Sequence, residues 1–335
     1  MATLQAMMVF NDRKLATGTL HMLSVLMIGA GGVGGYYGAR LAEAGHRVVL
    51  TARGAHLVAL KKKGLLVHYE NRQIECRVPA VDHATLMQDY QPGDFDVVAI
   101  ALKSTATKAV LDELGPWLAQ SDVPVLSLQN GVDNEPLIAK RLGESRVLGG
   151  LAVRIGGHIV GPGVVEAEGV AQIIMGEWPV VPDEQDARRP LLEILQTAFE
   201  KAGIPSIVSD NIRSELWRKL VINNGVNPIS ALTGLDTQSL TRHPRLSQIV
   251  QGMMAEAAAA AKADGVELGK ADVDEMFALI SSFNAIKTSM LVDKEKGRPL
   301  ELDGIAGAVL RRSNELGIDA PYTTTVNALL EHGLN

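Results

Sequence analysis

Residues 23–46, LSVLMIGAGGVGGYYGARLAEAGH, contain the pattern that decides the fold of this 335-residue chain. Residues 23–28 form a short apolar run typical of a buried strand, glycines follow at once, and residues 36–44 have the composition of a helix. Gly45 is placed to end that helix, and residues 47–52 form a second apolar run. We therefore predict a strand, a tight turn, a helix and a second strand, which together make one βαβ unit.

The glycine spacing inside this unit predicts a nucleotide site. Gly29, Gly31 and Gly34 match G-x-G-x-x-G between the predicted strand and helix. In such a turn the first glycine allows the bend, the second lets a pyrophosphate approach the backbone, and the third allows close helix packing. A merely flexible glycine loop is the alternative, and the flanking strands make it the weaker interpretation. We predict a Rossmann-type dinucleotide-binding domain.

The end of the second strand indicates which dinucleotide binds. An NAD-selective site normally places Asp or Glu there, where the carboxylate accepts hydrogen bonds from the ribose 2′-hydroxyl. This chain has Thr51, Ala52 and Arg53 instead. The Arg53 guanidinium can make a charge-assisted contact to a 2′-phosphate. We expect the cofactor to be NADP(H), and the missing carboxylate also disfavours FAD.

Polar residues follow two further strands of this predicted domain. Residues 96–102 form an apolar run that ends in Lys103, and residues 123–128 run into Asn130. Open α/β sheets bind ligands at the carboxyl edge of their strands. Lys103 and Asn130 are therefore candidate cofactor contacts, with ordinary strand-end polar residues as the alternative.

The chain length and a change of pattern indicate two domains. Residues 65–78 alternate like a strand pair, and the Gly- and Val-rich strands of residues 147–175 predict an antiparallel extension of the sheet. Beyond Asp210 the pattern changes to long helical segments. We expect an N-terminal extension at residues 1–22, an NADP-binding Rossmann-type domain at residues 23–209, and an all-α substrate and catalytic domain at residues 210–335.

Residues 215–228, ELWRKLVINNGVNP, predict the catalytic face of the helical domain. Lys219, Asn223 and Asn227 recur at i, i+4 and i+8, which places them along one face of a helix. The alternative is a solvated stripe on a surface helix. The nucleotide motif upstream and a carboxylate in a helical segment downstream favour a site where lysine, cofactor and acid meet.

Composition excludes several classes of protein. A net charge of -6 argues against a nucleic-acid partner. Cys76 is the only cysteine, which excludes an intrachain disulfide and points to the cytoplasm. The eight histidines have no short metal-binding spacing, so no metal site is expected. No apolar run approaches the ~20 residues that cross a bilayer, so no membrane partner is expected. The long helical domain is compatible with a homodimer.

In this order, the landmarks resemble the ketopantoate reductase family, also called 2-dehydropantoate 2-reductases. The resemblance covers residues 23 to about 330 and rests on GAGGVGGYYGARLAEAGH, TAR, ALKS, LQNGVDNE with VLGG, ELWRKLVINNGVNPISALTG and TSMLVDKEKGRPLELDGIAG. It implies NADPH-dependent reduction of ketopantoate to pantoate, a step of pantothenate biosynthesis. Its implied catalytic residues are Lys219, as general acid, and Glu301, as the acidic partner. Its implied substrate-binding groups are Asn223, Asn227 and Ser289, and its implied cofactor positions are Gly29, Gly31, Gly34, Arg53, Lys103 and Asn130.

The chemistry agrees with these implied roles, because hydride delivery to a 2-keto acid leaves negative charge on the carbonyl oxygen. A protonated lysine can stabilise that charge and supply the proton. The chain departs from the family pattern at Gly304 to Ala306, where an aromatic residue and an asparagine are common. A different branched 2-keto acid is therefore the alternative substrate. A non-catalytic NADP-binding regulatory protein is the second alternative, and the presence of the lysine, serine, glutamate and both asparagines together argues against it. A short-chain dehydrogenase is excluded because none of the five tyrosines has a lysine four residues later.

Overall fold

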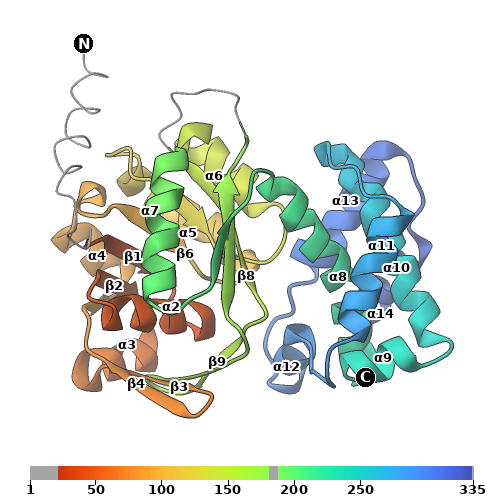
Figure 1. The fold of residues 1–335 in the computed structure, drawn as a ribbon, viewed down its shortest axis with the longest axis horizontal. Helices are drawn as coiled ribbons and strands as arrows, with labels where there is room; N and C mark the ends of the chain where they lie inside the picture. Colours follow the sequence, from red (N-terminus) through yellow and green to blue (C-terminus); the bar gives the residue numbers. More distant parts are fainter. Residues whose placement is uncertain (1–21, 181–187, 334–335) are drawn as a thin grey trace.

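The computed structural model describes residues 22–180 and 188–333 and places two parts side by side (Figure 1). Its strands all lie within residues 24–208, and the described residues from 212 onward contain only helices and connections. The predicted fold class, a Rossmann-type α/β domain followed by an all-α domain, is confirmed. The predicted N-terminal extension, residues 1–22, lies outside the described residues except for Met22.

The βαβ unit forms as predicted, with β1 (Ser24–Ile28), α2 (Gly32–Glu43) and β2 (Arg47–Thr51). The strands are parallel and Val25 pairs with Val48. Helix α2 begins four residues before the predicted start, because the glycines form its first turn. That turn lies so close to β1 that a side-chain carbon on Gly34 would stand 2.1 Å from the Gly29 carbonyl oxygen.

The large sheet has the strand order β12-β11-β8-β7-β6-β1-β2-β5. Strands from β8 to β5 are parallel, whereas β11 runs antiparallel to β8. The remaining bounds are β5 Ala80–Val81, β6 Val97–Ile100, β7 Val125–Ser127, β8 Val147–Val153, β11 Gln172–Glu177 and β12 Ser206–Val208. Its helices are α3 Gly54–Lys63, α4 His83–Asp89, α5 Thr107–Leu118, α6 Asn134–Leu142 and α7 Arg188–Lys201.

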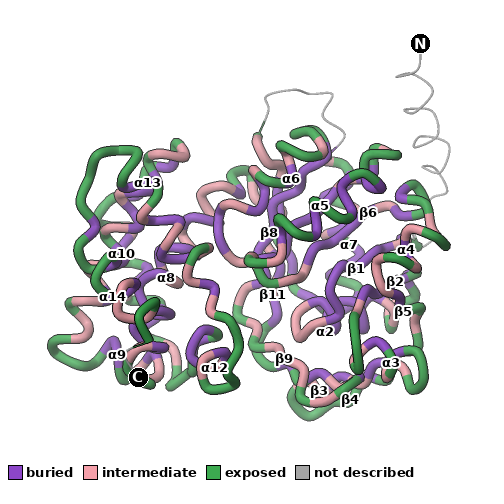
Figure 2. The backbone as a smooth tube through the Cα atoms, turned by 180° about the vertical axis from the view of Figure 1, so that it is seen from behind, coloured by how far each residue is buried: buried purple, intermediate pink, exposed green. Residues whose placement is uncertain are grey.

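Two apolar layers enclose this sheet. Helices α2 and α7 cover one face with residues such as Tyr36 and Leu192, and α4, α5 and α6 cover the other with Leu86, Leu114 and Ile138. Seen from behind, the strands are the buried centre of this part (Figure 2). Burial on both faces is expected for parallel strands, which explains their continuous apolar sequences.

A second, four-stranded sheet lies against α2 in the order β4-β3-β10-β9. Its strands are β3 Leu65–Tyr69, β4 Arg72–Cys76, β9 Gly156–Gly161 and β10 Val164–Glu168. The predicted strand pair in residues 65–78 is confirmed. The predicted antiparallel extension is correct for β8 and β11 and wrong for β9 and β10, because Val165 and Ala167 bury their side chains against the α2 side of this separate sheet.

The helical part is built around α8 (Ile212–Thr233), which packs on α10, α12 and α14 and also touches β8 and β11. The Asn211 side chain accepts a hydrogen bond from the Ser214 backbone N–H, and Gly234 ends the helix with a φ of 74°. The other helices are α9 Thr237–Arg242, α10 Leu246–Ala260, α11 Lys270–Ser281, α12 Ser289–Glu295, α13 Ala308–Leu316 and α14 Pro321–Glu331.

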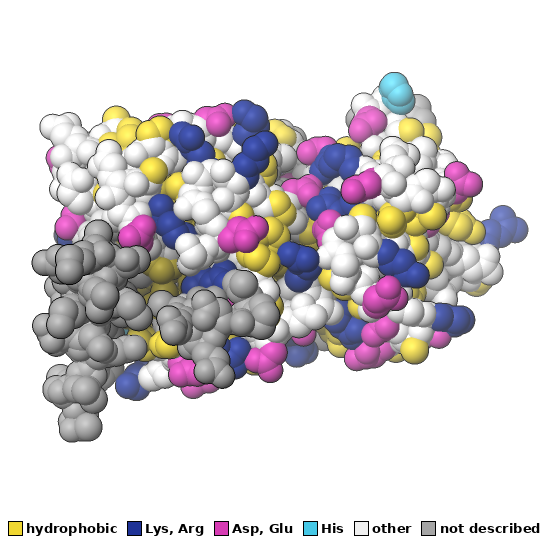
Figure 3. All heavy atoms as spheres, turned by 90° about the horizontal axis from the view of Figure 1, so that it is seen from above, with side chains coloured by type: hydrophobic (Ala, Val, Ile, Leu, Met, Phe, Trp, Pro, Cys, Tyr) yellow, Lys and Arg dark blue, Asp and Glu magenta, His cyan; other side chains and the backbone are white. Residues whose placement is uncertain are grey.

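The surface gives no sign of a membrane-spanning element in the described part of the chain. None of the helices within residues 22–180 and 188–333 combines the length and the apolar character needed to cross a bilayer. On the face seen from above, acidic and basic side chains are intermingled (Figure 3).

Candidate active site

The glycine turn forms a cradle at the N-terminus of α2. Gly29 has a φ of 103° and its N–H donates to the Thr51 hydroxyl at 2.9 Å. A side-chain carbon on Gly31 would meet nothing within 4 Å, whereas one on Gly32 would stand 2.0 Å from the Gly157 carbonyl carbon. The loop is therefore open at Gly31 and covered by β9 at Gly32, and the open side leaves room for a phosphate at the helix N-terminus.

Arg53 follows β2 directly and is the residue before α3. Its side chain is exposed and forms no hydrogen bond or ion pair with the described residues. His56, in the first turn of α3, accepts from the Gly163 N–H at 3.0 Å through Nδ1 and so donates through Nε2 to the Ala30 carbonyl at 2.8 Å. This histidine ties the glycine turn to the second sheet, and Arg53 is left free for a ligand beside the turn.

Glu301 is the centre of a buried polar cluster between the two parts of the molecule. Only 4% of the residue is exposed, and its Oε1 accepts from both the backbone N–H and the hydroxyl of Ser104 at 2.8 Å. Its Oε2 accepts from Lys103 Nζ at 3.2 Å and from Asn130 Nδ2 at 3.5 Å. Burial alone would raise the pKa of Glu301, but Lys103 and the Ser104 hydrogen bonds outweigh it and lower the pKa.

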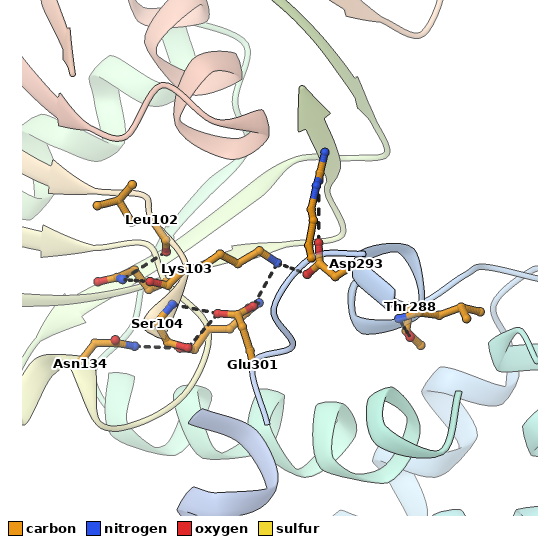
Figure 4. Close-up of polar contacts among 11 residues, drawn as sticks. Leu102, Lys103, Ser104, Asn134, Thr288, Asp293 and Glu301 are labelled. Carbon is orange, nitrogen blue, oxygen red and sulfur yellow. Dashed lines mark hydrogen bonds and ion pairs between the residues drawn. The ribbon is translucent and has the colours of Figure 1, made fainter. Parts of the chain in front are cut away.

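Lys103 bridges this cluster to α12 (Figure 4). Its Nζ lies 2.7 Å from Oδ2 of Asp293, which is 4% exposed, in addition to its contact with Glu301. Burial acts to lower the pKa of Lys103, and the two carboxylates more than reverse this effect, so the pKa is raised. Two carboxylates and one ammonium, with Asn130 and Ser104, thus lie at the carboxyl edge of β6 and β7.

Lys219 approaches the same region from α8. Its side chain is half-buried, and Nζ donates a hydrogen bond of 2.7 Å to the Ala152 carbonyl at the end of β8. Burial lowers the pKa of Lys219 to about 8, although the carboxylates of Glu301 and Glu135 act in the opposite direction. The predicted pairing with Glu301 is therefore electrostatic in this structure, since no direct hydrogen bond joins the two side chains.

The predicted polar stripe lies inside α8, which spans residues 212–233. Asn223 is half-buried and Asn227 is 5% exposed, and neither side chain forms a hydrogen bond with a described residue. Ser289, the first residue of α12, is exposed and equally unpaired within the described chain. Asn224, by contrast, points into the helical part and donates to the Met253 carbonyl and the Thr323 hydroxyl. The unpaired groups remain available to a ligand.

Comparisons with known proteins agree with this arrangement. The family model for "Ketopantoate reductase PanE/ApbA" matches residues 25–180, and that for its C-terminal domain matches residues 211–333. The chain belongs to the ketopantoate reductase family. A 2-dehydropantoate 2-reductase of Mesorhizobium japonicum is 34% identical over 324 residues, which cover 92% of this chain and 96% of the relative.

Solved structures of the family have the same fold. A PanE/ApbA family ketopantoate reductase from Ralstonia eutropha superposes with a TM-score of 0.80 at 31% identity and covers 92% of this chain and 97% of that one. A D-mandelate dehydrogenase, solved with NADH and anilino(oxo)acetate, has a TM-score of 0.81 at 24% identity with coverage of 92% and 97%, a likeness of fold alone. The chain is thus an oxidoreductase of this dinucleotide-binding family.

Several groups at the site of this family member were missed by the sequence analysis. Asp293 and Ser104 pair with predicted residues, and Asp293 stands four positions after Ser289 on one face of α12, a spacing that was available in the sequence. Gln129 donates to the Thr107 hydroxyl at 2.8 Å, and Thr107 donates to Asn134, which in turn donates to the Asn130 carbonyl. This chain of hydrogen bonds fixes the loops that carry Lys103 and Asn130.

The departure from the family pattern lies in one π-helical turn, Asp303–Gly307 (η5). A side-chain carbon on Gly304 would stand 2.7 Å from the Ser104 hydroxyl oxygen. A side-chain carbon on Gly131 would stand 3.0 Å from the Gly304 carbonyl oxygen. The absence of an aromatic side chain at Gly304 therefore lets this turn close directly on the sheet edge. Ala306 is fully buried and offers no polar group to the site.

A separate cavity lies beside the start of α8 and is not part of this cluster. Its lining includes Trp178, Arg213, Trp217 and Asp264. Arg213 stacks on Trp178, and the Trp217 indole N–H donates to Asp264. None of the predicted site residues lines it, so the buried polar cluster around Glu301 remains the candidate site.

Proposed function

We propose that this chain reduces ketopantoate to pantoate with NADPH, with Lys219 as the general acid. The observation that carries the proposal is the convergence of Lys219 with the buried Glu301 cluster where the sheet edge meets α8. A proton donor and a carboxylate held ionised lie there beside unpaired amide and hydroxyl groups. Within the family, this combination suits the reduction of a 2-keto acid that also bears a hydroxyl.

The residues around the glycine turn fit a dinucleotide. The space at Gly31 is free to receive a pyrophosphate at the α2 N-terminus, where the helix dipole favours negative charge. The unpaired guanidinium of Arg53 suits a 2′-phosphate, which supports NADP(H) rather than NAD(H). When bound, the nicotinamide supplies hydride chemistry. Lys103 and Asn130 are proposed cofactor contacts because they lie at the same carboxyl edge.

The lowered pKa of Lys219 suits general acid catalysis. A pKa of about 8 keeps the side chain protonated at neutral pH and makes it a stronger acid than an ordinary lysine. The ammonium would stabilise the negative charge that develops on the carbonyl oxygen and then donate its proton there. The Ala152 carbonyl holds the Lys219 ammonium in place before the substrate binds.

Glu301 and the unpaired amide and hydroxyl side chains could bind the carboxylate and hydroxyl groups of the substrate. Because its pKa is lowered, Glu301 stays ionised, and a substrate hydroxyl could donate to Oε2 in place of Asn130, whose contact with that oxygen is 3.5 Å long. Asn223, Asn227 and Ser289 can bind carboxylate and hydroxyl oxygens without adding a formal charge. These groups exceed what one carboxylate and one carbonyl require, which favours ketopantoate over a plain 2-keto acid.

A steady-state assay of NADPH oxidation tests the proposal. Ketopantoate, 2-ketoisovalerate and pyruvate are compared by kcat/KM, and ketopantoate should be the best substrate because it carries the hydroxyl that 2-ketoisovalerate lacks. A site that binds a hydroxyl rejects the analogue without it, since buried polar groups are left unpaired. Ala306 replaces a common family asparagine, so the discrimination should be smaller than the full family pattern would give.

Two other outcomes would identify the alternatives. A kcat/KM ratio near one, or in favour of 2-ketoisovalerate, would assign the chain to a different branched 2-keto acid with the same lysine chemistry. NADPH binding without turnover of any keto acid would indicate a regulatory NADP-binding protein. The proposed reaction is a cytoplasmic step of pantothenate biosynthesis, and a homodimer built on the helical part stays a prediction.

A further inference from the structure

Glu135 is a fully buried carboxyl group that the proposed reaction leaves unexplained. It lies in the first turn of α6, with 0% of the residue exposed. Neither carboxyl oxygen has a hydrogen-bonding partner of normal geometry among the described residues. A buried carboxyl without such partners costs free energy, so its presence asks for a reason beyond packing.

The edge of β8 brings this carboxyl close to Lys219. Strand β7 ends at Ser127, and its last pairing joins Leu126 to Leu148, so β8 continues for five residues without a paired strand on that side. The Trp178 N–H donates to the Val147 carbonyl, so the backbone groups of Val147 face β11. Because backbone groups alternate in direction along a strand, the other odd-numbered residues of β8 also face β11. The backbone groups of Gly150 and Ala152 therefore point to the side of β8 that has no paired strand.

Glu135 and Lys219 occupy this unpaired edge together. Lys219 Nζ donates to the Ala152 carbonyl. The pKa of the Glu135 carboxyl, which burial raises, is lowered in part by its own backbone N–H, by the Ser127 hydroxyl at the end of β7 and by the Gly150 backbone N–H. Residues two apart along a strand are separated by about 6–7 Å. The two side chains thus cover adjacent positions of one strand edge, from α8 on one side and α6 on the other.

The other charged groups near Glu135 and Lys219 are paired with one another, and none of the described cations forms a salt bridge with Glu135. Glu301 raises the pKa of Lys219 more than Glu135 does, and Glu301 is itself paired with Lys103 at 3.2 Å. Asp133 acts on Glu135, and its own charge is engaged by Arg311 at 2.7 Å and Arg312 at 2.8 Å. Glu135 itself forms no salt bridge with the described residues, and Lys219 is a basic group whose pKa its charge raises.

We propose that Glu135 is a positioning residue that keeps Lys219 protonated, an inference that rests on the proposed role of Lys219. Burial raises the pKa of Glu135 to about 7, so the carboxyl is ionised in the alkaline range where Lys219 would otherwise lose its proton. The negative charge then raises the pKa of Lys219 and offsets part of the effect of burial. Glu135 thereby adds to the effect of Glu301 and moves the alkaline limit of the reaction to higher pH.

Labelling of Lys219 tests this pairing without any substrate. The full chain is treated with acetic anhydride at a series of pH values, and the Lys219 peptide is quantified by mass spectrometry, because only the neutral amine reacts. In Glu135→Gln the midpoint of labelling should fall by about one pH unit. The matched control is Glu144→Gln, which removes an exposed carboxylate near the other end of α6 and should leave the midpoint unchanged.

A second variant guards against misfolding. Glu135→Leu removes the buried carboxyl altogether and should lower the midpoint equally. The alkaline limb of the kcat profile should move with the labelling midpoint in both variants. A wild-type midpoint in folded Glu135→Gln and Glu135→Leu would overturn the inference. A lowered midpoint in a chain that reduces no keto acid would support the pairing while overturning the proposed function.

Discussion

Ser104 donates two hydrogen bonds of 2.8 Å, one from its backbone N–H and one from its hydroxyl, to Oε1 of Glu301, although the residues are 197 positions apart. This contact joins the loop after β6 to the turn that follows α12. It also supplies two of the interactions that keep Glu301 ionised despite its burial. The site is therefore assembled only when the two parts of the molecule are in contact.

Replacing Ser104 by alanine should change the ionisation of Glu301. The hydroxyl hydrogen bond favours the carboxylate, so its loss should raise the pKa of Glu301 toward its ordinary range. Because the wild-type pKa is lowered, Glu301 should be protonated at a higher pH in the variant. The acid limb of the kcat/KM profile for ketopantoate should therefore move to higher pH. Ser104→Thr, which keeps a hydroxyl, is the control, and an unmoved acid limb in Ser104→Ala would contradict this role.

Two adjacent glycines should respond differently to alanine. Gly31→Ala meets open space, so the melting temperature should stay close to wild type while NADPH binding weakens about tenfold or more, equivalent to about 1.4 kcal/mol. Gly32→Ala drives a methyl group into the backbone of Gly157 and should cost about 1–3 kcal/mol of stability. Thermal melts and fluorescence titration with NADPH measure both effects. Equal melting temperatures for the two variants would contradict the close approach of β9.

Arg53 should determine the preference for NADPH. Its guanidinium is exposed and unpaired within the described chain, and no carboxylate stands at the end of β2. Arg53→Ala should therefore raise the KM for NADPH and leave the KM for NADH largely unchanged. Arg47→Ala, at the exposed opposite end of β2, is a matched control. Equal kcat/KM values of the wild-type chain for NADPH and NADH would contradict the role of Arg53 in cofactor preference.

Local patterns in the sequence were sufficient to predict the helices and strands that carry the candidate site residues. The glycine spacing predicted the turn before α2, and the i, i+4, i+8 recurrence predicted the face of α8 that carries Lys219. Both depend on neighbours within about two helical turns, where backbone geometry alone decides which side chains share a face. The strand ends at Lys103 and Asn130 were predictable because parallel strands finish at one edge.

The contacts between distant segments were not predictable in the same way. Asp293 and Ser104 belong to the Glu301 cluster only because α12 and η5 fold back on the sheet edge, and no local period records that approach. Strands β9 and β10 joined a separate sheet because their apolar faces pack on the α2 side. The position of Glu135 beside the edge of β8 depends on β7 being shorter than β8. The apolar runs in the sequence do not define where these two strands end.

The most direct test of the account is the turnover of Lys219→Ala with NADPH and ketopantoate, measured beside NADPH binding in the same preparation. General acid catalysis is typically worth about 10²–10⁴ in rate, so kcat should fall by that factor while the Kd for NADPH stays near wild type. Lys108→Ala, an exposed lysine on α5, provides the matched control. A folded Lys219→Ala variant that turns over within a factor of ~3 of wild type would contradict the central claim that Lys219 is the acid.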